Sequence, residues 1–149
     1  IKADGRLEAG KPHRATLDVV PRALPALLRA DQLGCRAAAT GFDWPRAADV
    51  LDKIDEEARE LREAVTGDGA TSATAEEELG DLLFAMANLA RKLGIAPETA
   101  LRRACDKFQD RFESMEHGIL NEGQTIDALS LDELDRRWNL AKAATKGRT

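Results

Sequence analysis

The strongest constraint on the fold is the spacing of apolar residues, which follows the period of an α-helix along most of the chain. Between Pro45 and Gly67 an apolar residue returns every three or four positions, which predicts one helix with a single buried face. β-Branched residues are scarce, and no segment of the sequence alternates as a half-buried strand does. The predicted fold is therefore all-α, a bundle of four to five helices.

Prolines, capping residues and glycines predict where these helices begin and end. The helices are expected from Leu24 to Ala39, from Pro45 to Gly67, from near Thr74 to Gly94, from Pro97 to Ile119 and from Ser130 onward. Thr74 with Glu77, and Ser130 with Glu133, have the spacing of capping boxes. Residues 120–128 are expected to form a loop.

Composition and charge limit the domain organisation and the partners. Residues 1–22 are polar and interrupted by glycine and proline, so they are interpreted as a linker or N-terminal arm, followed by one domain at 23–145 and a tail at 146–149. A net charge of −5 without a basic stripe argues against a nucleic-acid polymer or an anionic membrane as partner. Cys35 and Cys105 lack metal or disulfide spacing, so we expect reduced, buried thiols and a cytoplasmic protein.

Carboxylates lie beside the core face on two successive helices. At 100° per residue, Glu57 and Glu60 share one flank of their helix with Lys53, and Glu78 and Asp81 share a flank of the next helix. If the two flanks meet, each pair of carboxylates ~5 Å apart repels by about 3 kcal/mol at an effective dielectric of 20. Such a cluster needs a cation, and an all-oxygen set suits Mg²⁺ or Mn²⁺ better than zinc. The alternative for each acidic pair is a solvated helix face.

Four further polar or aromatic residues are candidates for a substrate site, each with a structural alternative. Lys107 and Arg111 border the core face of the helix after Pro97 and would suit phosphate oxygens, or they pair with neighbouring aspartates. Asn88 would contact a base or a sugar, or it is a satisfied interior amide. Trp138 is either a core residue or the wall of a nucleobase site.

Three other residues receive structural interpretations. Gly80 inside a helix costs about 1 kcal/mol relative to alanine, which we expect close helix packing to explain; the alternative is room beside the carboxylates. Trp44 is expected to pack against the start of the following helix. Phe84 lies nearly opposite the apolar stripe of its helix, so that helix is expected to be covered twice, by its own domain and by a second subunit.

Together these segments resemble the MazG-type nucleoside triphosphate pyrophosphohydrolases, within the all-α NTP pyrophosphatase superfamily. The resemblance covers nearly the whole chain and is carried by "GFDWP" at 41–45, "KIDEEARE" at 53–60, "EEELGDLLFAMANLAR" at 76–91 and "DKFQDRF" at 106–112. The family pattern E-E-x-x-E followed by E-x-x-D is matched by Glu56, Glu57, Glu60, Glu78 and Asp81.

The resemblance implies Mg²⁺-dependent hydrolysis of an NTP or dNTP between the α and β phosphates, by a homodimer, with Mn²⁺ as a possible substitute. It implies metal ligation by Glu57, Glu60, Glu78 and Asp81, phosphate contacts by Lys53, Lys107 and Arg111, and a nucleoside contact by Trp138. Glu56 is the candidate acceptor for the proton of the attacking water. The resemblance further implies that the chain is the C-terminal domain of a two-domain protein. The alternative function is a non-catalytic, dimerising regulatory domain of a longer MazG protein.

Overall fold

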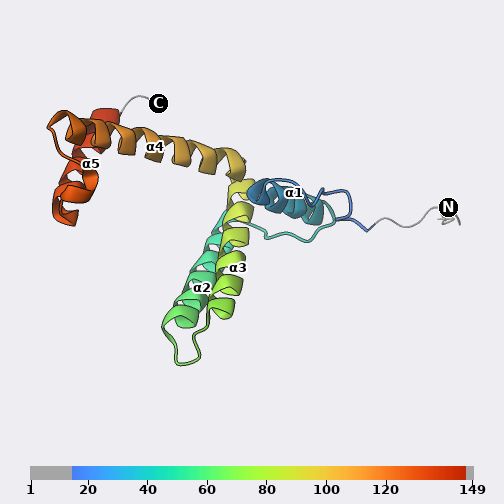
Figure 1. Ribbon diagram of the computed structural model, residues 1–149. Coiled ribbons are helices and arrows are strands. Elements are labelled where there is room, and N and C mark those ends of the chain that lie inside the picture. Colours follow the sequence, from blue (N-terminus) through green and yellow to red (C-terminus); the bar gives the residue numbers. More distant parts are fainter. Residues whose placement is uncertain (1–14, 147–149) are drawn as a thin grey trace, which may run out of the picture. The chain divides into compact units, whose positions relative to one another are not determined.

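The computed structural model describes residues 15–146 and shows an all-helical chain (Figure 1). The elements are α1 (Ala26–Ala39), α2 (Ala47–Thr66), α3 (Ser72–Lys92), α4 (Pro97–Asn121), the short 3₁₀ helix η1 (Ile126–Ala128) and α5 (Leu131–Thr145). Residues 15–146 contain no strand, which confirms the predicted all-α class. In this part of the chain no helix has both the length and the apolar content needed to cross a bilayer.

The chain divides into two compact units, the first ending at Glu98 and the second beginning at Thr99. Residues 1–14 and 147–149, which hold most of the predicted linker and tail, lie outside the described residues. The assignment of 23–145 to one domain stays a prediction.

Three predicted boundaries need correction. Helix α2 begins at Ala47, so Pro45 precedes the helix and does not occupy its first turn; Asp49 accepts the Arg46 backbone N–H at 3.0 Å instead. Helix α3 begins earlier than expected, because Thr71 Oγ1 accepts the Thr74 N–H at 3.1 Å. Residues 120–128 are not all loop, since α4 runs to Asn121 and η1 covers 126–128.

Other ends follow the local signals. Ser130 Oγ accepts the backbone N–H of Glu133 at 3.2 Å at the start of α5. Gly94 follows α3 with a φ of +70°, a left-handed conformation that glycine adopts without the steric penalty of a side chain. The residue types at these ends therefore predicted their geometry.

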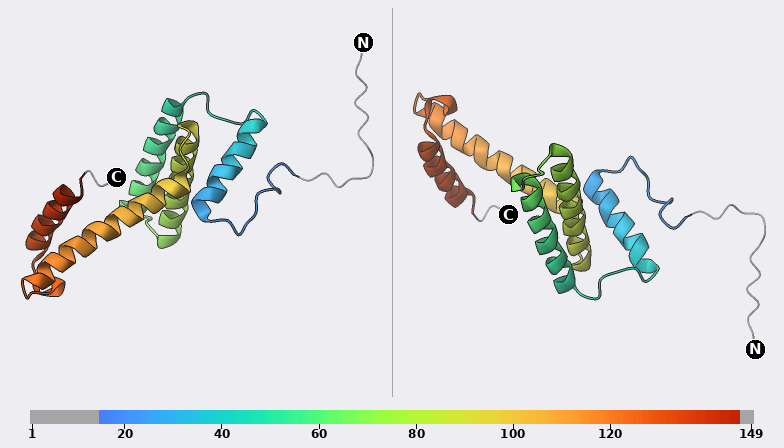
Figure 2. Two further views of the ribbon diagram at one scale, coloured as in Figure 1. Left: turned by 90° about the horizontal axis from the view of Figure 1, so that it is seen from above. Right: turned by 90° about the horizontal axis from the view of Figure 1, so that it is seen from below.

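In the first unit, α2 and α3 lie side by side and antiparallel, joined by residues 67–71, and α1 packs against α3 (Figures 1 and 2). The buried apolar side chains of α2 and α3 are small or medium in size: Val50, Ala85 and Ala87. Gly34 is buried where α1 meets α3, and a Cβ there would lie 2.5 Å from Asn88 Oδ1. The close approach of α1 to α3 thus requires glycine at this position.

Two interpretations of small residues are wrong. A Cβ on Gly80 would meet no atom within 4 Å among the described residues, so close packing does not explain this glycine. Cys35 and Cys105 are both exposed free thiols rather than buried ones.

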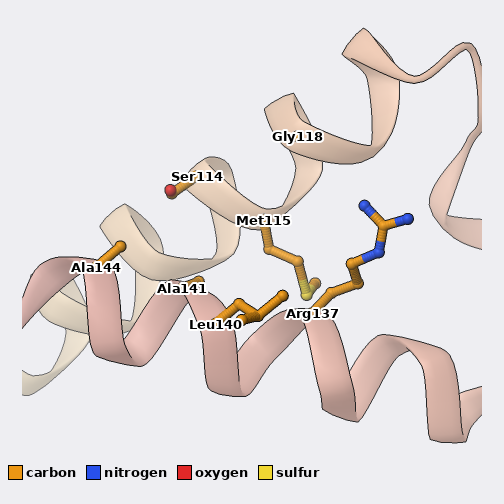
Figure 3. Close-up of a pocket in the computed structure, with 7 residues that line it drawn as sticks. All are labelled: Ser114, Met115, Gly118, Arg137, Leu140, Ala141 and Ala144. Atoms are coloured by element: carbon orange, nitrogen blue, oxygen red, sulfur yellow. The ribbon is translucent and has the colours of Figure 1, made fainter.

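The second unit packs α5 and η1 against the C-terminal half of α4. Its buried apolar residues are Met115, Ile119 and Ala141, and the partly buried ones around them are Phe112, Ile126, Leu129, Leu134 and Trp138. Figure 3 shows Met115 and Leu140 between the two helices, where they line a pocket of about 220 Å³. Arg137, at the edge of this pocket, donates to Glu122 at 2.8 Å and to Glu133 at 2.9 Å.

Candidate active site

Three of the four predicted metal ligands come together in the first unit. Glu57 and Glu60 on α2 and Glu78 on α3 each offer a carboxylate oxygen, and these oxygens lie within 4.8 Å of one another. The three carboxylates meet because α2 and α3 pack against each other and each helix carries its carboxylates beside the face that makes this contact. Glu57, Glu60 and Glu78 are called the acidic cluster below.

Glu57 is the most buried member of the acidic cluster, with 4% of its surface exposed. Lys53 Nζ lies 2.6 Å from Glu57 Oε1, and this contact raises the pKa of the lysine above its usual value. Glu57 Oε2 is buried and has no hydrogen-bond partner among the described residues. A buried carboxylate oxygen left in this state is unfavourable unless a cation or a donor binds it.

The acidic cluster carries more negative than positive charge. The pKa of Glu78 is raised, first by partial burial and then by the charges of Glu60 and Glu57. Lys53 is the cation that contacts Glu57, and it also lies 3.3 Å from Glu56. The oxygen-only donor set and the surplus charge fit a hard divalent cation.

Asp81 and Glu56 lie outside the acidic cluster. Asp81 is exposed on α3 and lines a neighbouring pocket together with Glu57. Glu56 is partly exposed and pairs with Lys53. The structure therefore places both residues beside the three clustered carboxylates rather than among them.

The pocket beside the acidic cluster has a volume of about 280 Å³. Its lining combines acidic, cationic and aromatic side chains: Trp44, Lys53, Glu57, Asp81, Phe84 and Ala85. Sequence reasoning missed Trp44 and Phe84 as lining residues. The spacing of three from Asp81 to Phe84, which puts both on one helix face, was a signal that could have found Phe84.

Asn88 lies inside the first unit and is 2% exposed. Its Nδ2 donates to the Phe84 carbonyl at 3.2 Å, and its Oδ1 accepts from Arg91 Nε at 3.3 Å. Gly34 of α1 is closely apposed to the same oxygen. This geometry favours the interior-amide interpretation of Asn88 over a contact with a base or sugar.

The remaining predicted substrate residues belong to the second unit. Arg111 Nε donates to Thr145 Oγ1 at 3.0 Å, which ties α4 to α5. Trp138 packs on Phe108 with 5.3 Å between ring centroids, and Lys107 is exposed on α4. A role for Lys107, Arg111 and Trp138 toward a nucleotide stays a prediction.

Residues 47–115 match the MazG nucleotide pyrophosphohydrolase domain, and this match includes the whole acidic cluster. These residues form a MazG domain. The chain is 39% identical over 142 residues to the nucleoside triphosphate pyrophosphohydrolase of Escherichia coli (strain K12), covering 95% of the chain and 53% of the relative. It is also 39% identical over 135 residues to the nucleoside triphosphate pyrophosphohydrolase/pyrophosphatase MazG of Thermotoga maritima, covering 91% and 51% respectively.

The chain is also similar over a shorter stretch to the uncharacterized protein YabN of Bacillus subtilis, with 45% identity over 65 residues, 44% of the chain and 13% of the relative. The chain spans about half the length of the Escherichia coli and Thermotoga relatives.

Proposed function

We propose that this chain hydrolyses nucleoside triphosphates, ribo or deoxyribo, between the α and β phosphates, giving the monophosphate and pyrophosphate. The observation that carries the proposal is the buried Glu57 Oε2, which lacks a partner among the described residues and belongs to a cluster of three carboxylates beside a pocket. The names of the Escherichia coli and Thermotoga maritima relatives, both nucleoside triphosphate pyrophosphohydrolases, support the same reaction.

The donor set supports Mg²⁺ as the metal, with Mn²⁺ as a substitute. Glu57, Glu60 and Glu78 would hold the ion, with Asp81 contributing from the edge of the pocket. When bound, Mg²⁺ supplies charge neutralisation for the triphosphate and lowers the pKa of a coordinated water.

The protein's own side chains have separate proposed tasks. Lys53 orients Glu57 through the 2.6 Å ion pair and lines the pocket, where its ammonium group attracts phosphate oxygens. Glu56 accepts the proton of the attacking water, and Lys107 and Arg111 bind phosphate oxygens. Trp138 borders the nucleoside. Asn88 contributes through the packing of α1 on α3.

We also infer a homodimer. Leu79, Leu83 and Met86 lie along one face of α3 and remain about half exposed in the single chain. A second copy that covers this face would remove them from water, which is the main driving force for association.

The proposed partner is a free nucleotide rather than a nucleic-acid polymer or a membrane, which agrees with the net charge of −5. We propose a cytoplasmic location, because both cysteines are exposed free thiols and such thiols persist in a reducing compartment.

The alternative is a non-catalytic, dimerising regulatory domain of a longer MazG protein. The exposed apolar face of α3 favours it, because such a face serves assembly whether or not the chain is an enzyme.

The test is a panel of ribo- and deoxyribonucleoside triphosphates with Mg²⁺ or Mn²⁺, in which pyrophosphate and orthophosphate are measured separately. We expect pyrophosphate with both metals, and a loss of kcat on the order of 100-fold or more in Glu57→Gln. Glu63→Gln, an exposed position on the same helix, is the matched control and should keep wild-type turnover. Orthophosphate as the product would contradict the reaction. An inactive wild-type dimer would favour the regulatory alternative.

A further inference from the structure

The segment that precedes α2 is held in place by a single carboxylate. Asp43 Oδ1 accepts from Arg91 Nη2 at 2.6 Å, and Asp43 Oδ2 accepts from Lys92 Nζ at 3.0 Å. Both cations belong to the last turn of α3, 48 and 49 residues further along the chain. Hydrogen bonds from the Arg91 guanidinium hold the pKa of Asp43 well below its usual value. The Asp43 carboxylate is therefore an ionised anchor at neutral pH.

The same contacts fix the backbone of Trp44 on both sides. Its N–H donates to Asp43 Oδ1 at 2.8 Å, and its carbonyl accepts from Lys92 Nζ at 2.7 Å. Lys92 thus binds the carboxylate and the following carbonyl together. Trp44 lies in no helix, yet neither of its backbone polar groups is left without a partner.

The anchor continues into the interior of the first unit. Arg91 also donates to Asn88 Oδ1, and Asn88 is the buried amide opposed to Gly34 of α1. The position of the Trp44 backbone is therefore tied to the packing of α1 on α3.

Trp44 lines the 280 Å³ pocket beside the acidic cluster, and Phe84 lines the same pocket from α3. Lys53 and the carboxylates Glu57 and Asp81 complete the lining. The pocket therefore combines aromatic side chains with charged ones. A nucleotide likewise combines a flat aromatic base at one end with a polyanion at the other. Aromatic side chains stack on bases of any sequence, and an indole offers a large face for that contact.

We propose that Trp44 is an aromatic wall for the nucleoside end of the substrate, in addition to the nucleoside contact proposed for Trp138. Asp43, with Lys92, is the positioning residue that holds this wall over the pocket. This inference rests on the proposed function. It assigns to the segment before α2 a role in recognising the nucleoside, whereas the acidic cluster binds the metal that neutralises the triphosphate.

The first experiment separates binding of the nucleoside from chemistry. Trp44→Ala is expected to raise the KM for a nucleoside triphosphate roughly tenfold, while kcat stays within about threefold of wild type. Trp44→Phe should restore most of the affinity. Phe42→Ala is the matched control, since Phe42 lies two positions earlier, is 83% exposed and does not line the pocket; its KM should be that of wild type.

Inorganic tripolyphosphate, used as a competitive inhibitor, keeps the charge of the substrate and lacks the nucleoside. Its inhibition constant should be the same in wild type and Trp44→Ala. If Trp44→Ala also weakens inhibition by tripolyphosphate about tenfold, the substitution has disrupted the pocket as a whole. That result would overturn the assignment of the indole to the nucleoside.

A double-mutant cycle tests the positioning role. Asp43→Asn keeps an acceptor for the Trp44 N–H and loses the charge that binds Arg91 and Lys92. It should raise KM by less than Trp44→Ala does, and it should cause no further rise when combined with Trp44→Ala. Additive effects would overturn the claim that Asp43 acts through Trp44.

The results distinguish a failure of the proposed function from a failure of the role assigned to Trp44. Wild-type protein that releases no pyrophosphate would remove the proposed function and this inference with it. Wild-type turnover together with an unchanged KM in Trp44→Ala would overturn this inference alone.

Discussion

Two groups of charged side chains in the first unit differ in how their charge is balanced. Around Asp43, one carboxylate meets two cations and a backbone amide, and its pKa is lowered. In the acidic cluster, three carboxylates lie together, Lys53 is the cation in contact with Glu57, and the pKa of Glu78 is raised. A balanced group of this kind stabilises the fold by itself. An unbalanced group gains its stability from a ligand of opposite charge, and this contrast separates a structural anchor from a binding site.

The largest change in the free energy of unfolding should come from adding a divalent cation that binds the acidic cluster. Mg²⁺ that binds only the folded chain raises the free energy of unfolding by about 2.7 kcal/mol at one hundred times its Kd. Urea unfolding with Mg²⁺ and with EDTA measures the difference. Glu57→Gln and Glu78→Gln should lose most of it, whereas Glu63→Gln and Asp43→Asn should keep it. An equal Mg²⁺ effect in all of these variants would erase the contrast between the two groups.

Neutralising the balanced group should destabilise the fold without any metal. Asp43→Asn is expected to lower the free energy of unfolding by about 2 kcal/mol at pH 7, because Arg91 and Lys92 lose their charged acceptor. Since the folded pKa of Asp43 lies below its usual 3.8, this contribution is complete above pH 3.8 and is lost as the pH falls further.

Urea midpoints of wild type and Asp43→Asn, measured in EDTA from pH 7 down to pH 2.5, should therefore draw closer together as the pH falls below 3.8. Glu133, whose pKa is lowered to about 2 by Arg136 and Arg137, affects both proteins alike and cancels in the difference. If the difference between the two urea midpoints does not change with pH, the charge of Asp43 is not what stabilises the anchor.

A smaller loss of stability should follow from adding a methyl group at Gly34, beside the buried Asn88 that Arg91 binds. Gly34→Ala brings a Cβ to 2.5 Å from Asn88 Oδ1, an atom held by Arg91 in a buried site. Overpacking costs exceed the gain in helix propensity, so the net loss is about 1 kcal/mol. Thermal unfolding measures it. Unchanged stability would mean that α1 is free to move away from α3.

The smallest effect, of opposite sign, is expected at the edge of the acidic cluster. Gly80→Ala meets no described atom within 4 Å and should stabilise α3 by about 0.5–1 kcal/mol. The same unfolding assay applies, with Gly34→Ala as the contrasting helical glycine. Destabilisation would reveal that another surface, such as a second copy, packs on Gly80 in solution.

The order and extent of the helices could be predicted from sequence because their signals are local. The apolar period and the caps placed α1, α4 and α5 within a few residues, but Thr71 was missed as the cap of α3 because its partner is another threonine rather than a glutamate. Angular position also placed Glu57, Glu60 and Glu78 on the correct flanks. It placed Asp81 on a flank as well, yet the structure leaves Asp81 exposed at the edge of the pocket, since a flank is wider than a coordination site.

Sequence alone determined the helical class, the identity of the acidic residues and the side of each helix on which they lie, because backbone hydrogen bonds between near neighbours fix the helical period. Only the tertiary structure decided which charges meet. The pairing of Asp43 with Arg91 and Lys92 spans almost fifty residues, and the lack of a partner for Glu57 Oε2 among the described residues depends on how α3 packs against α2. Such contacts depend on the relative placement of whole helices, which no local pattern encodes.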